Sequence, residues 1–239
     1  MKKRADVVVV EQGHAKSRTA AAELIRTSNI VTDDIVIKKP SDLIALDAKI
    51  QVITPLPYVG RGGTKLAHAL DAFRIDVTGK KVADIGASTG GFTDCLLQRK
   101  IKKVYAIDVG HSQLAPELRD DSRVVVMEST DARTVTLPEQ VDLAVIDVSF
   151  ISLEHILPHI KELLLPQGEI VALIKPQFEV GRENLGKQGV VKDEHARNEA
   201  VNAVIEKAKD LGFSVQGITE PPILGGTGNK EFLAHLTLR

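Results

Sequence analysis

The segment at residues 82–92, which reads VADIGASTGGF, restricts the fold of this chain more than any other stretch. An apolar approach runs into a turn with three glycines, Gly86, Gly90 and Gly91, and residues 93–97 then return to the apolar spacing of a helix. Glycine supplies the unusual backbone angles and the close ligand approach that such a turn needs. A strand, a Gly-rich turn and a helix in succession predict an α/β domain whose ligand crevice opens here.

Two common nucleotide-binding motifs do not fit this turn. Gly86 and Gly90 are separated by Ala-Ser-Thr, which is not the dinucleotide fingerprint, and no Lys-Ser or Lys-Thr follows to make a P-loop. The D-x-G-x-x-x-G pattern that starts at Asp84 resembles the first motif of S-adenosylmethionine (SAM) dependent methyltransferases. A strand-to-helix turn without a ligand is the alternative at this point.

Composition excludes several classes of protein. The chain has 239 residues, of which 43% are hydrophobic and 26% charged, and this suits one medium domain with a smaller one. The single cysteine, Cys95, excludes a disulfide framework, and the histidines show no metal-ligand clustering, so we expect no metal. No apolar run approaches the roughly 20 residues of a membrane span. We therefore expect a cytoplasmic protein without membrane contact.

Charge is unevenly distributed along the chain. Residues 1–65 hold eleven lysines and arginines against seven aspartates and glutamates, while the net charge of the whole chain is −1. This pattern favours a basic module that binds a polyanion, joined to a less basic catalytic body. A chance excess is the alternative.

Residues 1–57 have the pattern of a small α+β module. A short apolar segment at residues 6–12 is followed by a helix that Ser17 caps and that runs to Ser28. Short strands are expected at residues 30–31, 35–37 and 50–53, with a turn at Asp33 and Asp34.

An S4 RNA-binding domain has a similar pattern of residues. The positions that carry the resemblance are Ser17, Arg18, Ala21, Leu24, Ile25, Lys39 and Pro40. Arg18 is the best candidate to hold an RNA phosphate as a bidentate donor, and a solvated arginine at a helix start is the alternative.

A proline-containing linker at residues 54–60 separates this module from a second domain, residues 61–239. Thr64 is expected to cap a helix that ends at Phe73. Arg61 and Lys65 then lie at a helix N-terminus, where cations are unfavourable for the helix dipole. This conflict indicates a negative substrate or nearby carboxylates, and two surface cations are the alternative.

Acidic residues follow three predicted strands of the second domain. Asp108 follows the strand at residues 103–107, in the position that holds a ribose diol, and Asp131 follows the strand at 124–127, where it can accept from an adenine amino group. Asp147 closes the strand at residues 142–146 and should point into the crevice, the alternative being a cap for a helix near Ser152.

The later part of the chain adds a lysine and a glutamate at strand ends. A helix over residues 153–165 should kink or start late at Pro158. Lys175 ends the strand at residues 168–174, which is costly unless this amine is paired or functional. Pro176 is expected to keep the chain extended after it, before a Gly-rich loop over the site at residues 177–191.

The chain should finish with a helix and two strands. Asp193 is expected to cap a helix that ends at Leu211. The strands at residues 213–218 and 232–238 should form an antiparallel pair, and Glu231 immediately precedes the second of them.

Lys65, Asp147, Lys175 and Glu231 together resemble the K-D-K-E tetrad of FtsJ-like ribose 2′-O-methyltransferases. With the S4-like front, nearly the whole chain is similar to the TlyA (hemolysin A) family of ribosomal RNA methyltransferases. This resemblance implies an α/β fold with a Rossmann-like SAM methyltransferase sheet, mostly parallel with an antiparallel last strand. It also implies SAM as the cofactor, and ribosomal RNA or ribosomal subunits as the partner.

The resemblance also implies a set of site residues. Lys175 would be the base or the group that polarises the ribose hydroxyl, Asp147 would orient it, and Glu231 would hold Lys65 or the ribose. SAM contacts are implied for Asp84, Gly86, Ala87, Ser88, Gly90, Gly91, Phe92, Asp108, Asp131 and Asp147. RNA contacts are implied for Arg18, Arg61 and Lys65.

Two other functions stay open at this stage. One is a non-catalytic RNA-binding or ribosome assembly factor, and the other is a membrane-active hemolysin, which the family name suggests. The sequence Asp147-Val148-Ser149-Phe150 disfavours amino-group methylation, since those enzymes usually carry Asn-Pro-Pro-Tyr at this point. The sequence leaves the modified nucleotide, the ribosomal subunit and the oligomeric state open.

Overall fold

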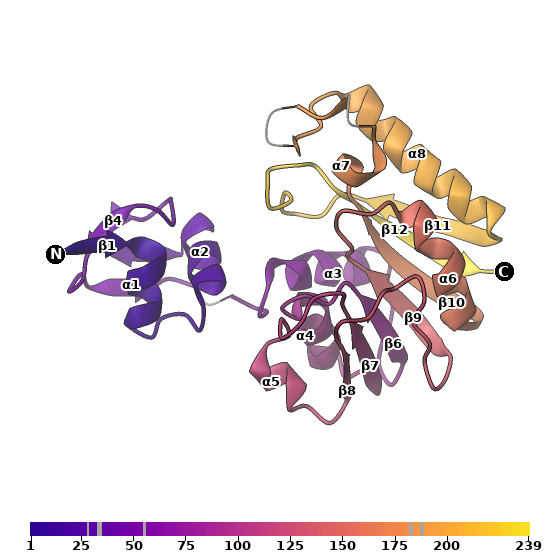
Figure 1. Cartoon of the computed structure of the whole chain (residues 1–239), viewed down its shortest axis with the longest axis horizontal. Helices are drawn as coiled ribbons and strands as arrows, with labels where there is room; N and C mark the ends of the chain where they lie inside the picture. Colours follow the sequence, from indigo (N-terminus) through magenta and orange to yellow (C-terminus); the bar gives the residue numbers. More distant parts are fainter. Residues whose placement is uncertain (28, 33–34, 55, 182–183, 187–188) are drawn as a thin grey trace. The chain divides into compact units, whose positions relative to one another are not determined.

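The structure is a computed structural model that describes residues 1–27, 29–32, 35–54, 56–181, 184–186 and 189–239. The chain forms two compact units, a first unit, Met1–Arg61, and a second unit, Gly62–Arg239 (Figure 1). Four sequence predictions fall wholly or partly outside the described residues: the helix end at Ser28, the turn at Asp33 and Asp34, Pro55 of the linker, and part of the loop at 177–191.

The first unit combines two helices with two small antiparallel sheets. The helices are α1 (Ala5–Glu11) and α2 (Arg18–Arg26), and the predicted cap is confirmed, since Oγ of Ser17 accepts from the Ala20 N–H at 3.2 Å. One sheet pairs β1 (Lys2–Arg4) with β4 (Leu43–Ala45), and the other has β2 (Ile30–Thr32) between β3 (Ile35–Val36) and β5 (Ile50–Val52). Apolar residues of both helices and of β2 and β4 share one core, including Val8, Val9, Ile25, Ile30 and Ile44.

A seven-stranded sheet forms the centre of the second unit, in the order β11-β12-β10-β9-β6-β7-β8. The strands are β6 (Lys81–Ile85), β7 (Lys103–Ile107), β8 (Val124–Met127), β9 (Val141–Ile146), β10 (Leu164–Ile174), β11 (Phe213–Thr219) and β12 (Phe232–Leu238). Strands β8, β7, β6, β9 and β10 are parallel, and β12 is antiparallel to both of its neighbours. The predicted α/β fold with an antiparallel last strand is therefore confirmed.

Helices cover both faces of this sheet. They are α3 (Arg61–Ala72), α4 (Gly91–Gln98), α5 (Pro116–Arg119), the 3-10 helix η1 (Leu153–His155), α6 (Leu157–Leu163), α7 (Pro176–Glu179) and α8 (Glu194–Asp210). Ala83 and Ile85 of β6 share a core with α6 and α8. Because side chains alternate along a strand, Asp84 points to the other face, where it meets Thr93 of α4.

Three local predictions need correction. Helix α3 begins at Arg61, so Thr64 lies inside its first turns and does not cap it. Pro176 does not keep the chain extended, because it is the first residue of α7, a position where the missing N–H costs nothing. Strand β10 starts at Leu164, four residues earlier than predicted, with an irregular register between Leu164 and Glu169.

Other local predictions hold. Pro158 lies in the first turn of α6, so the helix starts late, as predicted. Asp193 caps α8 by accepting from the His195 N–H at 3.0 Å. Cys95 is a fully buried residue of α4 and is not part of a disulfide.

Candidate active site

The polar residues predicted for the site follow the strands at one edge of the sheet, which we call the carboxyl edge. The parallel strands all end there, so Asp108, Asp131, Asp147 and Lys175 reach the same edge from β7, β8, β9 and β10. Strand β12 runs the other way, and Ile174 pairs with Phe232. Its preceding residue, Glu231, therefore lies at the carboxyl edge as well.

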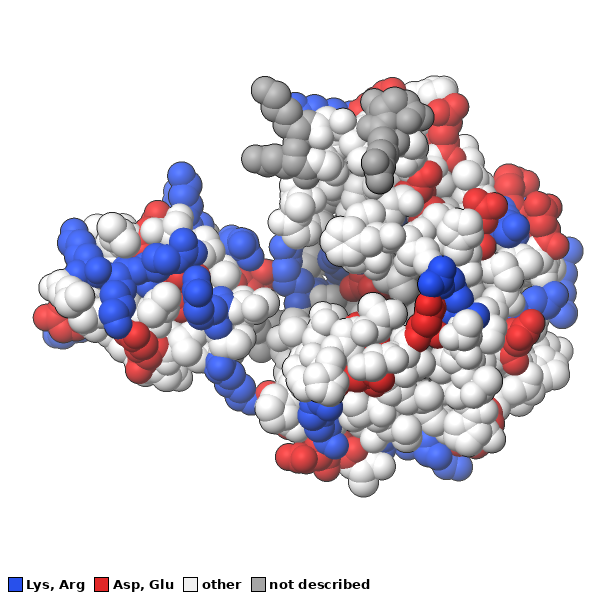
Figure 2. Space-filling model, viewed as in Figure 1, with Lys and Arg blue, Asp and Glu red and all other residues white. Residues whose placement is uncertain are grey.

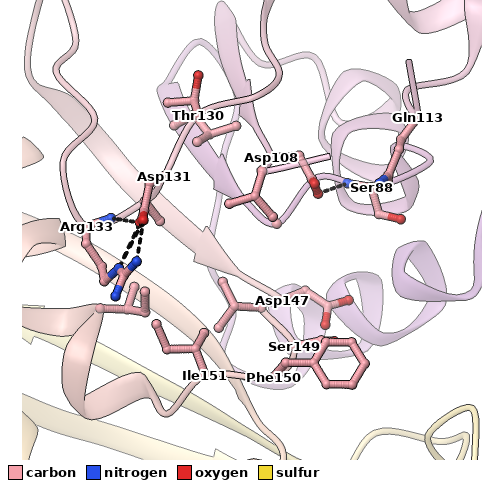
Figure 3. A pocket seen from close by; sticks show the side chains of 16 residues that line it. Ser88, Asp108, Gln113, Thr130, Asp131, Arg133, Asp147, Ser149, Phe150 and Ile151 are labelled. Carbon is pink, nitrogen blue, oxygen red and sulfur yellow. Dashed lines mark hydrogen bonds and ion pairs between the residues drawn. The ribbon is translucent and has the colours of Figure 1, made fainter. Parts of the chain in front are cut away.

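A pocket of about 450 Å³ opens at the carboxyl edge (Figure 3). It is lined by Gly86 and Ser88 from the Gly-rich turn, by the loops after β7 and β8, and by the segment after β9, residues 147–151. Of the residues that sequence analysis assigned to the cofactor, the pocket brings together Gly86, Ser88, Asp108, Asp131 and Asp147.

Asp108 lies between the Gly-rich turn and its own loop. Its Oδ2 accepts from the Ser88 N–H at 2.8 Å, and its Oδ1 accepts from the Gly110 N–H at 2.7 Å. The carboxylate thus fixes the loops that line two sides of the pocket. Figure 3 shows Asp108 beside Ser88, with Asp131 at a separate part of the wall.

Asp131 is paired within its own loop. The guanidinium of Arg133 binds both carboxylate oxygens, with Nη2 2.5 Å from Oδ2, and the Arg133 N–H donates at 2.8 Å. These bonds lower the pKa of Asp131 to about 2. The carboxylate is therefore ionised and oriented, and its pairing with Arg133 was not predicted from the sequence.

The Gly-rich turn needs glycine at two of its positions. Gly86 has a φ of +86°, and a Cβ added there would lie 2.6 Å from the backbone oxygen of Asp147. Gly90, at the N-cap of α4, has a φ of +98°, and its added Cβ would lie 2.2 Å from a methyl carbon of Leu118. The turn therefore approaches the segment after β9 more closely than any other residue type allows.

Asp84 lies under this turn and is fully buried. Its Oδ2 accepts from the Thr93 hydroxyl at 2.6 Å, while its Oδ1 has no hydrogen-bond partner within the described part of the chain. Burial raises the pKa of Asp84 to about 7, and the nearby charges of Asp147 and Asp108 add to this rise. A buried carboxyl with an unused oxygen beside a pocket is typical of functional sites.

Lys175 and Asp147 form the first of two ion pairs at this edge. Nζ of Lys175 lies 2.6 Å from Oδ1 of Asp147 and donates to Oγ of Ser149 at 2.8 Å. The lysine side chain is 11% exposed. The amine that ends β10 is thus held by two groups from the segment after β9.

Lys65 and Glu231 form the second pair, and it is more deeply buried. Their Nζ and Oε2 atoms are 2.5 Å apart, and the side chains are 8% and 3% exposed. An added Cβ on Gly225 would lie 2.3 Å from Oε1 of Glu231, so the backbone of that loop packs directly on the carboxylate. Each cation of the predicted tetrad therefore has one carboxylate of the tetrad as its partner.

Helix α3 links the two pairs. Gly62, one turn before Lys65, places its added Cβ 3.5 Å from Oδ2 of Asp147 and 3.0 Å from the ring of Phe92. The start of α3 therefore touches the carboxylate that holds Lys175, while the same helix carries Lys65. All four tetrad residues converge on this part of the carboxyl edge.

Comparison with known proteins identifies the family. A family model described as "FtsJ-like methyltransferase" matches residues 58–238. "Putative rRNA methyltransferase YqxC" of Bacillus subtilis is 45% identical over 98% of this chain and 85% of that protein. "16S/23S rRNA (cytidine-2'-O)-methyltransferase TlyA" of Mycobacterium tuberculosis is 44% identical over 98% of this chain and 89% of that protein. The chain belongs to the TlyA family of FtsJ-like methyltransferases.

A solved structure described as "Putative hemolysin from Streptococcus thermophilus" extends the likeness of this TlyA-family chain to three dimensions. It is 42% identical, has a TM-score of 0.79, and covers 99% of this chain and 88% of its own. The names TlyA and hemolysin thus attach to proteins that share both sequence and fold with this one.

The remaining residues predicted for this TlyA-family site lie around the pocket and not on its wall. Ala87 and Phe92 are buried, at 6% and 3% exposure, and Gly91 is the first residue of α4. Phe92 supports the start of α3 at Gly62. They shape the turn that lines the pocket.

The predicted RNA-binding arginines lie in the first unit of this family member. Arg18 bonds to the carboxylate of Asp6. Arg61 has its Nε 3.3 Å from Oε1 of Glu23. Neither carboxylate was predicted as a partner, because nothing local in the sequence links residues 12 or 38 positions apart.

Two residues near the pocket were missed by sequence reasoning. Phe150 is 90% exposed, has a φ of +65°, and lies with its ring 5.0 Å from that of Phe178. Glu179 accepts from the Ser152 hydroxyl at 2.6 Å and from the Leu153 N–H at 3.0 Å. The available signals were the sequence Asp147-Val148-Ser149-Phe150 for the first residue and KPQFE, residues 175–179, for the second.

The structure also bears on the membrane and metal hypotheses. In the described ranges, no helix is both long and apolar enough to cross a membrane. The same ranges contain no cluster of three His, Cys, Asp or Glu side chains that could hold a metal ion.

Proposed function

We propose that this chain transfers a methyl group from SAM to a ribose 2′-hydroxyl of ribosomal RNA. The observation that carries the proposal is the pair of Lys175 and Asp147 beside the pocket, within a chain of the FtsJ-like methyltransferase family. Relatives at 44–45% identity are named as rRNA methyltransferases, and the one from Mycobacterium tuberculosis as a cytidine-2′-O enzyme.

The pocket residues fit SAM as the cofactor. Gly86 leaves no room for a side chain against Asp147, Asp108 stands where a ribose diol is commonly held, and Asp84 offers an unused buried carboxyl oxygen. We assign Asp84, the Gly-rich turn, Asp108 and Asp131 to its binding. When bound, SAM supplies a methyl group already activated by its sulfonium charge.

The chain then has to orient and deprotonate the acceptor. A ribose hydroxyl is a weak nucleophile until its proton leaves, and a positioned general base contributes about 10²–10⁴-fold to such a step. We assign Lys175 to receive or polarise this proton, since Asp147 and Ser149 fix its amine. We assign Lys65 to the binding of the acceptor ribose or its phosphate, with Glu231 holding its amine in place.

Phe150 supports a nucleotide substrate. The chain has only six Phe and two Tyr, so an exposed aromatic ring such as that of Phe150 is unusual. Phe150 lines the pocket, three residues after Asp147. Bases stack readily on such rings, with about 1–3 kcal/mol for each base. We assign Phe150 to hold the target base beside the ribose that is methylated.

The first unit supplies the charge for an RNA contact. Lys and Arg side chains cover much of the face of this unit that Figure 2 shows. The exposed cations are Lys2, Arg4, Lys16, Arg18, Arg26, Lys38, Lys39 and Lys49. Such a surface binds phosphates without reading bases, and we assign this S4-like unit to RNA binding.

Transfer of tritiated methyl groups from SAM to isolated ribosomal subunits tests the proposal. We expect label on ribose in the wild type, found as dinucleotides resistant to alkaline hydrolysis, and at least a 100-fold lower rate for Lys175→Ala. Lys103→Ala, at the opposite edge of the sheet, is the matched control and should keep its activity. Label on a base, or full activity of Lys175→Ala, would contradict the mechanism.

A further inference from the structure

Asp6 is a buried carboxylate that holds two arginines of the first unit. It lies in the first turn of α1 and is 3% exposed. Its Oδ1 accepts from Nε of Arg4 at 2.9 Å, and its Oδ2 accepts from Nη2 of Arg4 at 3.1 Å and Nη2 of Arg18 at 2.9 Å. Nε of Arg18 approaches the same Oδ2 at 3.3 Å. One carboxylate thus joins the end of β1 to the start of α2.

The two guanidinium groups emerge into solvent although their partner is buried. The side chains of Arg4 and Arg18 are 46% and 62% exposed, while that of Asp6 is 4% exposed. Each arginine uses its Nε and Nη2 atoms toward Asp6. Because the guanidinium is a rigid planar fork, its Nη1 side then faces away from the carboxylate and remains available to an anion.

From net charge alone, the negative charge of Asp6 should weaken the binding of RNA. It lowers by one the net charge of a unit whose exposed charged side chains are mostly basic (Figure 2). The bonds from Arg4, with those from Arg18, lower the pKa of Asp6, so the carboxylate stays ionised at neutral pH. In return, it keeps two like-charged groups side by side in one orientation, which they would not keep alone.

We propose that Asp6 is a positioning residue that holds Arg4 and Arg18 as an oriented pair for one phosphate group of the RNA substrate. The proposal rests on the proposed function, which supplies the RNA. It adds a requirement that charge alone does not predict, namely that a negative side chain strengthens the binding of a polyanion.

The experiment compares two variants that change net charge equally. Asp6→Asn removes the buried carboxylate, and Glu11→Gln removes an exposed carboxylate of the same unit, which pairs with Lys3 at 2.7 Å. Affinity of the full-length protein for ribosomal subunits is measured at several salt concentrations without SAM. Thermal unfolding and SAM binding are measured in parallel.

We expect Asp6→Asn to weaken RNA binding about tenfold although it adds positive charge, because the arginine pair loses its orientation. Its slope of log affinity against log salt should fall by about one, as one phosphate contact is lost. Glu11→Gln should bind as tightly as the wild type or up to about twofold tighter. SAM binding should be unchanged in both variants.

Binding by Asp6→Asn that equals or exceeds that of Glu11→Gln, with an unchanged salt slope, would overturn the proposal. If Asp6→Asn does not fold, Arg18→Lys takes its place, since lysine keeps the positive charge but lacks the planar guanidinium. Wild-type RNA affinity in Arg18→Lys would also overturn the proposal. The affinities are independent of methyl transfer. A failure of ribose methylation therefore counts against the proposed function, and a failure of these comparisons counts against the role of Asp6.

Discussion

The two edges of the central sheet both carry lysines and acids, but these groups differ in burial and in their number of partners. At the amino edge, where the parallel strands begin, Glu139 accepts from Nζ of Lys103 at 3.1 Å and from the Tyr105 hydroxyl at 2.8 Å, and it also pairs with Lys81. Its side chain is 31% exposed. Bonds from Lys81, and then those from Tyr105 and Lys103, lower the pKa of Glu139 to about 2.

At the carboxyl edge, two of the acids, Glu231 and Asp84, have fewer partners and less contact with water than Glu139. Glu231 is 3% exposed with Lys65 as its ion-pair partner, and Asp84 is fully buried with one hydrogen bond to Thr93. The pKa of Asp84 moves up, whereas that of Glu139 moves down. Lysines and acids at a strand end therefore do not by themselves mark a site; burial with few partners is what separates Asp84 and Glu231 from Glu139.

Removal of Glu231 should show the largest difference between the edges. Glu231→Ala leaves the ammonium of Lys65 buried without its partner, and we expect a loss of about 3–5 kcal/mol in the free energy of unfolding. Glu139→Ala opens a partly hydrated cluster and should cost much less. Urea denaturation of both variants measures the free energy of unfolding. Equal decreases in the two variants would contradict the difference between the two edges.

Asp84 and Glu139 should change the free energy of unfolding with pH in opposite directions, because their pKa values are shifted in opposite directions. The raised pKa of Asp84 contributes stability that is complete below about pH 4 and is lost as pH rises through about 7. The Asp84→Asn variant has no carboxyl group to ionise here, so it does not lose this stability. The free energy of unfolding of the variant minus that of the wild type should therefore rise by about 3 kcal/mol between pH 5 and pH 8.

Glu139 serves as the control for this titration. Its lowered pKa contributes stability that is present above about pH 4.5 and is lost as pH falls toward 2. The difference between Glu139→Gln and the wild type should therefore change only in acid. Urea denaturation across this pH range checks both signs, and parallel curves for the two variants would contradict them.

Two glycines with left-handed backbones offer a matched test of the pocket. Gly86 and Gly79 have φ values of +86° and +72°, at the carboxyl and amino edges respectively. Alanine costs about 1–2 kcal/mol at either from backbone strain. An added Cβ at Gly79 meets nothing within 4 Å, whereas at Gly86 it meets the backbone of Asp147. We expect about 2 kcal/mol or more for Gly86→Ala, with loss of SAM binding by calorimetry, and normal SAM binding for Gly79→Ala.

The smallest effect concerns Glu179, which ties the segment after β10 to the segment after β9. Glu179→Ala frees Ser152 and Leu153, and the shift of the nearby Lys175 and Asp147 should lower the rate of methyl transfer about tenfold. Glu154→Ala, an exposed acid whose side chain is 3.8 Å from Lys207, should leave the rate unchanged. A Glu179→Ala enzyme with the wild-type rate would show that the contacts of Glu179 with Ser152 and Leu153 do not position Lys175 and Asp147.

The sheet was predictable because its strands are local apolar runs bounded by turns. Strands β7, β8 and β12 have the predicted limits, since each is a short run of Val, Ile, Leu or aromatic residues. By contrast, β1 consists of Lys2-Lys3-Arg4 and forms only through pairing with β4, about forty residues later. Residues 5–11 are rich in valine, yet they form helix α1 because both helices of the first unit share one core.

Chain topology predicted the site as a set of strand ends, whereas the pairing of Lys175 with Asp147 and of Lys65 with Glu231 was implied only by the family resemblance. Parallel topology places Asp108, Asp147 and Lys175 at one edge whatever their partners are. That Lys65 pairs with Glu231, 166 positions away, depends on the reversal of β12, and that Arg133 occupies Asp131 depends on a loop conformation. Neither distance nor burial can be read from spacing, so the depth of the Lys65–Glu231 pair and the partner of Asp131 had to come from the structure.

The position of β12 sets the order in which this enzyme can become active during its synthesis. This strand follows the other described strands in the sequence, yet it is inserted between β10 and β11, and only then does Glu231 meet Lys65. Until that moment a growing polypeptide can bury most of the parallel strands while the amine of Lys65 still lacks its counter-ion. We therefore expect the Lys65–Glu231 pair to form after the parallel strands and separately from the rest of the core.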